Sequence, residues 1–270
     1  MPGRAGGMPP VRKSLGQHFL TDRGILGRIV DALAPRPDET VVEVGPGRGS
    51  LTDVLRQRAG HVVGIEIDRA LAGILTQRYA GDSRVRILQA DVLSVDLAQA
   101  AGGPFALVGN VPYNITTPIL FHALRRPRPT RMVFLVQREV ADRMQASPGG
   151  REFGALTVNL QVLATVRTLF GVPAGAFHPK PKVSSAVVEV VPLATPAVQA
   201  DEEAPFREFV QAVFGMRRKQ MKRLIRAIIP SSREAAEILL ERTGIAPEAR
   251  PETLRVEQFV ALFRTTRTGA

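Results

Sequence analysis

Residues 110–113 read Asn-Val-Pro-Tyr and follow a short apolar run, 105–109, that predicts a strand. The side-chain carbonyl of Asn110 and the main-chain carbonyl before Pro112 can both accept hydrogen bonds from one exocyclic amine. The ring of Tyr113 offers a face on which a planar base can stack. A flipped adenine presents both features, an amine and a flat π-face. The alternative is a strand that ends in an Asn-Pro type of turn, and these four residues alone do not exclude it.

A second candidate group is the glycine-rich stretch that follows the predicted strand 40–44. Gly45, Gly47 and Gly49 alternate with other residues before a predicted helix. Glycines at such a point let the backbone approach a ligand and turn sharply into the helix. The spacing is Gly-x-Gly-x-Gly, which differs from the Gly-x-Gly-x-x-Gly of dinucleotide dehydrogenases. S-adenosylmethionine (SAM) has no pyrophosphate, so the spacing fits SAM better than a dinucleotide.

Two carboxylates stand at the ends of the next two predicted strands. Glu66 ends the second strand, where it can bind ribose hydroxyls in a bidentate way, and Asp91 follows the third, where it can accept from an adenine amine. Taken singly, each is more often a solvated loop carboxylate. Because the binding crevice of parallel sheets lies at the carboxyl ends of the strands, the two acids, the glycines and Asn110 together predict a SAM site.

The charge of the chain is its most informative bulk property. Against 25 acidic residues there are 36 basic ones, a formal net charge of +11, which favours a polyanionic partner such as nucleic acid. An arginine-rich composition can also reflect genome base bias, but the basic residues cluster. One cluster, which we call the basic segment, comprises Arg217, Arg218, Lys219, Lys222, Arg223 and Arg226; the other comprises Arg125, Arg126, Arg128 and Arg131. We expect the basic segment to bind RNA phosphates, with a solvated helical face as the alternative.

The remaining composition excludes several classes of protein. There is no cysteine, and the four histidines show no ligand spacing, so we expect no metal. No apolar run approaches the roughly 18 residues that span a membrane, and residues 1–13 form a basic arm rather than a secretory signal. We therefore expect a cytoplasmic protein without a membrane contact.

Short apolar strands alternate with amphipathic helices through the first two-thirds of the chain, which predicts an α/β fold with a doubly wound, mostly parallel sheet. Strands are expected at 40–44, 61–67, 84–89, 105–109 and 131–137, and an antiparallel edge pair at 164–170 and 184–190. Helices are expected after Asp22 and at 50–59, 69–79, 115–124 and 138–145. We predict a flexible arm at 1–13, a catalytic domain at 14–192, a linker at 193–205 and an all-helical RNA-binding domain at 206–270.

The motifs together resemble the KsgA (RsmA) family of small-subunit rRNA adenine dimethyltransferases, over nearly the whole chain. The segments that carry the resemblance are 13–20 (KSLGQHFL), 43–49, 109–118, 177–185 (FHPKPKVSS), 214–219 and 250–254. The family implies a class I SAM-dependent methyltransferase fold with a small helical C-terminal domain. It also implies dimethylation of two adjacent adenosines in a hairpin near the 3′ end of 16S rRNA, on a 30S assembly intermediate. We expect a monomer.

Site residues follow from the matching motifs. The resemblance assigns SAM binding to His18, Leu20, Gly45, Gly47, Glu66, Asp91 and Asn110. It assigns the methylation pocket to Asn110, Pro112, Tyr113 and Phe177, the last on the opposite face of the base. The alternative for Phe177 is a core aromatic beside a turn. Two departures from the family pattern are His18, where many members carry Asn, and Val111, where Leu is common.

Two other functions stay open at this point. A 23S rRNA adenine methyltransferase of the macrolide-resistance type shares the Asn-x-Pro-Tyr motif, although segment 15–20 and the basic segment fit the KsgA family better. An rRNA-binding assembly factor with incidental catalysis is the second, and the presence of Glu66, Asp91 and Asn110 argues that the chemistry is retained.

Overall fold

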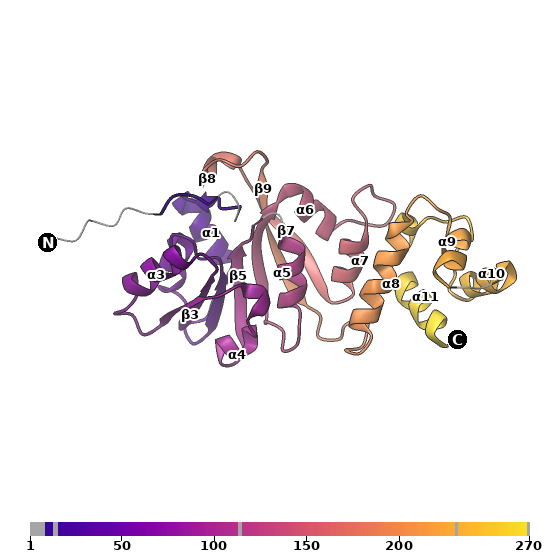
Figure 1. Cartoon of the computed structure of the whole chain (residues 1–270), viewed down its shortest axis with the longest axis horizontal. Helices are drawn as coiled ribbons and strands as arrows, with labels where there is room; N and C mark the ends of the chain where they lie inside the picture. The colour runs from indigo at the N-terminus through magenta and orange to yellow at the C-terminus, as the bar shows by residue number, and fades with distance from the viewer. Residues whose placement is uncertain (1–8, 13–15, 113–114, 230–231, 269–270) are drawn as a thin grey trace. The chain divides into compact units, whose positions relative to one another are not determined.

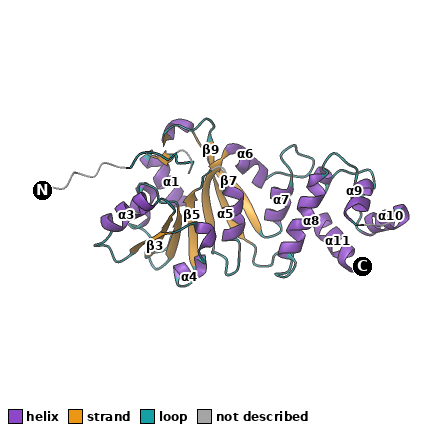
Figure 2. Cartoon of the chain, viewed as in Figure 1, coloured by secondary structure: helices purple, strands orange, loops and turns teal. Residues whose placement is uncertain are grey.

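The computed structural model describes residues 9–12, 16–112, 115–229 and 232–268, and it separates into two compact units. The first unit holds residues up to 138 and 167–191, and the second holds 139–166 and residues from 192 onward. Figures 1 and 2 show that the strands belong almost entirely to the first unit, whereas the second is built from helices.

A seven-stranded sheet, in the order β4-β3-β2-β5-β6-β9-β7, forms the first unit. Its strands are β2 (Thr40–Val44), β3 (His61–Glu66), β4 (Val85–Gln89), β5 (Phe105–Asn110), β6 (Met132–Gln137), β7 (Ala164–Val172) and β9 (Ser185–Pro192). The first five in spatial order pair in parallel, and β9 pairs antiparallel with β6. A separate antiparallel pair joins β1 (Phe19–Leu20) to β8 (Phe177–His178). The predicted α/β class with an antiparallel edge is confirmed.

The helices of this unit are α1 (Arg23–Leu33), α2 (Ser50–Leu55), α3 (Arg69–Arg78), α4 (Leu97–Ala101) and α5 (Thr116–Ala123). An aspartate side chain caps the first turn of three of them, α1, α3 and α4. The Asp22 carboxylate accepts from the Ile25 amide and starts α1, as predicted. Apolar residues recur every three or four positions along α1, and they pack with the inner faces of β2, β3 and β5 in a continuous core.

The second unit contains the helices α6 (Arg138–Met144), α7 (Ala155–Gln161), α8 (Glu203–Gly215), α9 (Met221–Ile228), α10 (Arg233–Arg242) and α11 (Val256–Thr268). Only the first residue of α6, Arg138, is assigned to the first unit. Its core is aromatic: Phe206 meets Phe263 edge to face at 5.4 Å between ring centroids, and Phe214 stacks on Phe259 at 5.5 Å. Earlier in the chain, α4 and α7 are helices that the sequence pattern did not predict.

Two segments of the chain form the second unit: one runs from Pro192 onward, and the other, 139–166, comes from earlier in the chain. Residues 139–166 belong to the helical unit because Phe153 packs on Phe214 and the Gly149 amide donates to the Glu252 carbonyl at 2.7 Å. The predicted linker 193–205 also overlaps α8, which begins at Glu203. Arg264 donates to Glu202 and to the Ala197 carbonyl, so part of that segment is anchored within the unit.

Candidate functional site

A cleft opens at the carboxyl ends of the parallel strands of the first unit. Ligand pockets occupy this place in open α/β sheets. The predicted site residues that line the cleft are His18, Leu20, Gly45, Gly47, Glu66, Asp91, Asn110 and Pro112. The structure therefore brings together residues separated by more than 90 positions in the sequence.

The glycine-rich turn is held open by positive backbone torsions. Gly45 and Gly47 have φ of +69° and +58°, in the left-handed region that favours glycine. A side chain at Gly47 would also lie 3.0 Å from the ring of Phe19, which packs over the turn. Bare backbone at these two positions thus forms one wall of the cleft.

Glu66 connects this turn to the next strand end. Its carboxylate is 4% exposed and accepts from the amides of Gly47 and Asp68, each at 2.9 Å. Burial raises the pKa of Glu66, and the backbone hydrogen bonds offset only part of that effect. Each carboxylate oxygen can accept a second hydrogen bond, so the group remains suited to the hydroxyls of a ribose.

Asp91 differs from Glu66 in its surroundings. It is exposed, and its carboxylate accepts from the Leu93 amide at 3.0 Å, which caps the short 3₁₀ turn Val92–Ser94. Ile67, which is 49% exposed, and Val92 also line the cleft. An acceptor next to apolar side chains suits a flat base that carries an amine.

Asn110 ends β5, and its amide is fixed by the N-terminal segment. Its Nδ2 donates to the main-chain oxygen of His18 at 2.8 Å, so the side-chain oxygen is the end of the amide that remains for an amine to donate to. That segment is itself anchored, because Gln17 donates to the buried Asp68 at 3.1 Å. The side-chain ring of His18 is directed to the Pro179 carbonyl, at 2.7 Å.

Tyr113 and Phe177 complete the predicted methylation pocket. Tyr113 lies outside the described residues. Phe177 is 4% exposed and packs in the core cluster beside Leu20, with which it pairs between β8 and β1. It does not line the cleft, so its role against a base stays a prediction.

The residues around the cleft fit SAM. Bare glycine backbone, a buried carboxylate for hydroxyls, an exposed carboxylate for an amine and apolar side chains between them match the parts of an adenosine. Among the described residues, no group of three or more His, Asp or Glu side chains is arranged to hold a metal ion, and no helix is long and apolar enough to cross a membrane.

Comparisons with known proteins decide the family. A model described as ribosomal RNA adenine dimethylase matches residues 9–267. The chain belongs to the ribosomal RNA adenine dimethylase family. It is 45% identical to the ribosomal RNA small subunit methyltransferase A of Xanthomonas campestris over 94% of this chain and 95% of that protein. The same enzyme of Xanthomonas axonopodis is 46% identical over the same shares.

Two solved structures resemble this dimethylase over most of its length. The dimethyladenosine transferase of Plasmodium falciparum has a TM-score of 0.78 and 25% identity, covering 91% of this chain and 96% of its own. The 23S rRNA methyltransferase ErmE has a TM-score of 0.71 and 29% identity, covering 92% and 99%. The predicted class I methyltransferase fold, the SAM cofactor and the enzyme class are confirmed.

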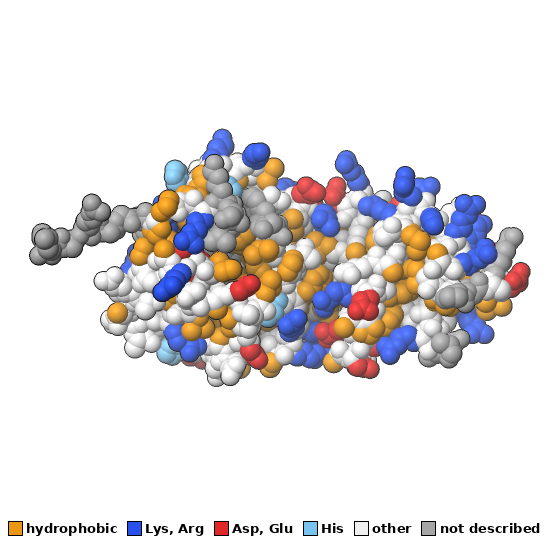
Figure 3. All heavy atoms as spheres, viewed as in Figure 1, with side chains coloured by type: hydrophobic (Ala, Val, Ile, Leu, Met, Phe, Trp, Pro, Cys, Tyr) orange, Lys and Arg blue, Asp and Glu red, His pale blue; other side chains and the backbone are white. Residues whose placement is uncertain are grey.

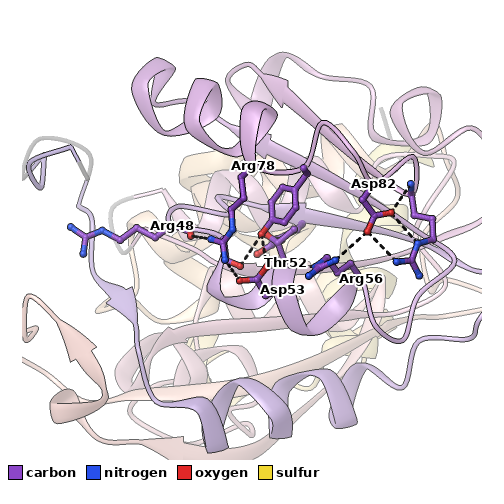
Figure 4. A network of polar contacts seen from close by, with 10 residues as sticks. Arg48, Thr52, Asp53, Arg56, Arg78 and Asp82 are labelled. Carbon is purple, nitrogen blue, oxygen red and sulfur yellow. Dashed lines mark hydrogen bonds and ion pairs between the residues drawn. The ribbon is translucent and has the colours of Figure 1, made fainter. Parts of the chain in front are cut away.

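Beneath the glycine turn, the dimethylase has a polar network that sequence reasoning missed (Figure 4). Asp53 accepts from Arg78 and Tyr79, and Arg78 also donates to the Arg48 carbonyl at 3.1 Å. Deeper in the same region, Thr52 donates to Glu43 at 2.6 Å. Burial raises the pKa of Glu43 to about 8, so this acid is largely protonated at neutral pH. A lone carboxylate inside a strand was the only signal that could have drawn attention to it.

The basic segment of the dimethylase separates into two groups. Arg217 donates to the Arg151 carbonyl at 2.9 Å and lies 3.6 Å from Glu252, and Lys222 pairs with Glu248 at 2.9 Å. The exposed members are Arg218, Lys219, Arg223 and Arg226. Figure 3 shows basic side chains gathered over the part of the helical unit that carries α9. Met221, Leu224 and Ile225 form the buried face of α9, so Arg223 and Arg226 lie on its outer face.

Two members of the other basic cluster, Arg128 and Arg131, are held by contacts within the first unit. Arg131 donates to the Leu33 and Ala34 carbonyls and pairs with Glu39 at 2.7 Å, which joins the end of α1 to β6. Burial alone would raise the pKa of Glu39, but the hydrogen bonds from Arg131 and Arg36 outweigh it and lower the pKa. Arg128 donates to the Leu124 carbonyl. Sequence reasoning did not separate these internal contacts from a surface for RNA.

Proposed function

We propose that this chain dimethylates the exocyclic amine of adenine in small-subunit rRNA, with SAM as the methyl donor. By resemblance, the targets are two adjacent adenosines in a hairpin near the 3′ end of 16S rRNA, on a 30S assembly intermediate in the cytoplasm. The relatives at 45–46% identity are small-subunit methyltransferases, whereas the 23S enzyme ErmE is 29% identical. We expect a monomer, to be checked by sedimentation.

The observation that carries this proposal is the setting of Asn110. Its Nδ2 is committed to the His18 carbonyl, so its oxygen can accept from the target amine. An aryl amine is a weak nucleophile because its lone pair is delocalised into the ring. Hydrogen bonds from the amine to Asn110 and to the carbonyl before Pro112 favour a pyramidal nitrogen whose lone pair points away from these acceptors.

When bound, SAM supplies an electrophilic methyl group on a sulfonium that is already a good leaving group. The protein therefore needs no metal and no dedicated base for the chemistry; its task is alignment and desolvation. Effective molarity from alignment contributes about 7–11 kcal/mol at best. Tyr113 and Phe177 are proposed to stack on the flipped base and to offset a flipping cost of a few kcal/mol, in order of magnitude.

The proposal is tested by methyl transfer from radiolabelled SAM to purified, unmethylated subunits. We expect label in the small subunit, recovered as dimethyladenine from 16S rRNA, and none above background with the Asn110→Ala protein. Label confined to large subunits would instead support the 23S reaction. Tight binding to small subunits without any label would support an assembly factor.

A further inference from the structure

We propose that His18 is a positioning residue, whose ring holds the loop 178–184 and whose main-chain oxygen holds the amide of Asn110. The inference rests on the function proposed above. Two hydrogen bonds meet at this one residue: Asn110 Nδ2 donates to the His18 main-chain oxygen at 2.8 Å, and the ring Nδ1 lies 2.7 Å from the Pro179 carbonyl. Residues 110, 18 and 179 are thereby joined although 161 positions separate the last two.

The chemistry of the second contact fixes the role of the ring. A carbonyl oxygen only accepts, so Nδ1 must carry the proton and donate to Pro179. The main chain of the same segment runs antiparallel to β8, with Phe19 opposite His178, and Thr21 donates to the Ala176 carbonyl at 3.0 Å. The ring therefore extends a backbone pairing by one side-chain hydrogen bond, at the point where β8 ends and the loop begins.

The loop held in this way presents polar and apolar groups to solvent. Lys180, Lys182 and Ser184 are exposed, Val183 is 46% exposed, and Pro181 is buried as an anchor. Two cations beside an exposed apolar side chain suit a single-stranded RNA segment, which offers phosphates and unstacked bases. RNA held by this loop would be held in a fixed relation to Asn110, because His18 bonds to both.

The geometry predicts which side chains can replace His18. In asparagine, Nδ2 stands the same number of bonds from Cα as Nδ1 does in histidine, and it is always a hydrogen-bond donor. In leucine, a methyl carbon of similar position cannot donate. His18→Asn should therefore preserve the tie to Pro179, and His18→Leu should remove it while keeping comparable bulk.

The test combines three measurements on the full-length protein. His18→Leu should lower kcat for small subunits by about 10–100-fold, because small displacements of reacting groups are costly, while the Kd for SAM changes by less than about threefold. His18→Asn should restore kcat to within about threefold of the parent. Hydrogen exchange without SAM should be several-fold faster at the amides of Lys180, Lys182 and Val183 in His18→Leu than in His18→Asn.

Controls keep this inference separate from the proposed function. His61→Leu, at the exposed start of β3, should leave exchange in the loop and the SAM Kd unchanged. Equal defects in the Leu and Asn variants, or a loss of SAM affinity as large as the loss of kcat, would overturn the positioning role. If the parent itself methylates no small subunits, the proposed function fails, and the exchange experiment still decides whether His18 holds the loop.

Discussion

The cleft of the first unit and the basic segment of the second have opposite physical characters. In the cleft, Glu66 is buried, and the amides of Gly47 and Asp68 hold its carboxylate. In the basic segment, Arg223 and Arg226 lie exposed on one helix. Burying a polar group without partners is costly, whereas an exposed cation costs little wherever it lies.

This difference determines what each region can reveal about its ligand. Interactions inside the cleft are short-ranged and directional, so the positions of donors and acceptors indicate the shape of an adenosine. Attraction by exposed charges is long-ranged and screened by salt, so those residues indicate only that the partner is anionic. Substitutions in the cleft should therefore affect one step, either SAM binding or methyl transfer. Substitutions in the basic segment should weaken RNA binding in proportion to the charge that is removed.

The largest effect is expected from Asn110. Asn110→Ala removes both the acceptor for the target amine and the tie to His18, so kcat should fall by about 10²–10³-fold. Single-turnover methylation of small subunits measures this directly. Tyr113→Ala should likewise lose turnover while it keeps SAM affinity, since its proposed contact is with the base.

A matched variant separates the two roles of this amide. Asn110→Asp keeps an acceptor of the same size but cannot donate to the His18 carbonyl. We expect its kcat to lie between those of the parent and Asn110→Ala. If Asn110→Ala turns over like the parent, Asn110 does not belong to the site. The directional contacts that distinguish the cleft from the basic segment would then not include this amide.

The next effect tests the exposed cations. Replacing Arg218, Lys219, Arg223 and Arg226 by Ala should weaken small-subunit binding about 100-fold at moderate salt and should flatten the salt dependence, because fewer counterions are released. SAM affinity should be unchanged. Filter binding across a range of salt concentrations, with calorimetry for SAM, provides both measurements.

An equal loss of charge elsewhere is the control. The variant carries Ala at Arg23, Arg69, Arg242 and Arg255, all exposed, and it also lowers the net charge of +11 by four. If both quadruple variants lose small-subunit affinity to the same extent, net charge rather than the basic segment attracts the RNA. The double variant of Arg217 and Lys222 should instead lower stability slightly, since these two residues form ion pairs within the unit.

Sequence reasoning predicted the sheet of the first unit to within a residue or two at most strand ends. Strands such as β2 and β6 are buried and rich in β-branched residues, and turn residues bound them clearly. Each predicted site residue at a strand end also lines the cleft, because parallel topology fixes where strand ends meet. For the sheet, the sequence pattern is therefore enough to predict which residues meet at the cleft.

The rest depended on tertiary contacts that no local pattern encodes. Helix α7 is short and mostly buried, so its sequence, Ala155–Gln161, lacks an amphipathic period. Phe177 is adjacent to a proline-rich loop like a pocket residue, yet it packs in the core. Arg131 and Arg217 look like members of charge clusters, and only the structure shows that they bind Glu39 and Glu252.

A smaller effect is expected from Glu66. Glu66→Ala should weaken SAM binding by about 1–3 kcal/mol, because ribose hydroxyls would then be buried without an acceptor. Calorimetry measures the affinity, and thermal unfolding checks the fold, since the variant also loses two acceptors for backbone amides. Unchanged affinity in a folded variant would exclude Glu66 from the cofactor site. Glu189→Ala, on the partly exposed ion pair with Arg167, serves as the control.

The smallest effect concerns stability rather than ligand binding, and it arises from Glu43. An unfolded carboxyl has a pKa near 4.5, whereas burial raises that of Glu43 to about 8. Below pH 4.5 both states are protonated and the side chain adds no pH dependence. As the pH rises from 4.5 to 8, the unfolded chain loses its proton while the folded chain keeps it, so the parent loses stability over this window.

Glu43→Gln isolates this effect, because glutamine is neutral at every pH and can still accept from Thr52. The charges of Glu66 and Asp53 also raise the pKa of Glu43, and both residues are kept in the variant. Since a buried site relaxes when its carboxyl ionises, we expect the variant to be more stable than the parent by about 1–2 kcal/mol at pH 8, and by almost nothing at pH 4.5. Denaturant unfolding at both pH values measures the difference, with the exposed Glu208→Gln as control. If the difference in stability between Glu43→Gln and the parent is the same at both pH values, Glu43 is ionised in the folded protein at pH 8. The interior beside the cleft would then accommodate a buried charge, as the protein surface accommodates exposed ones.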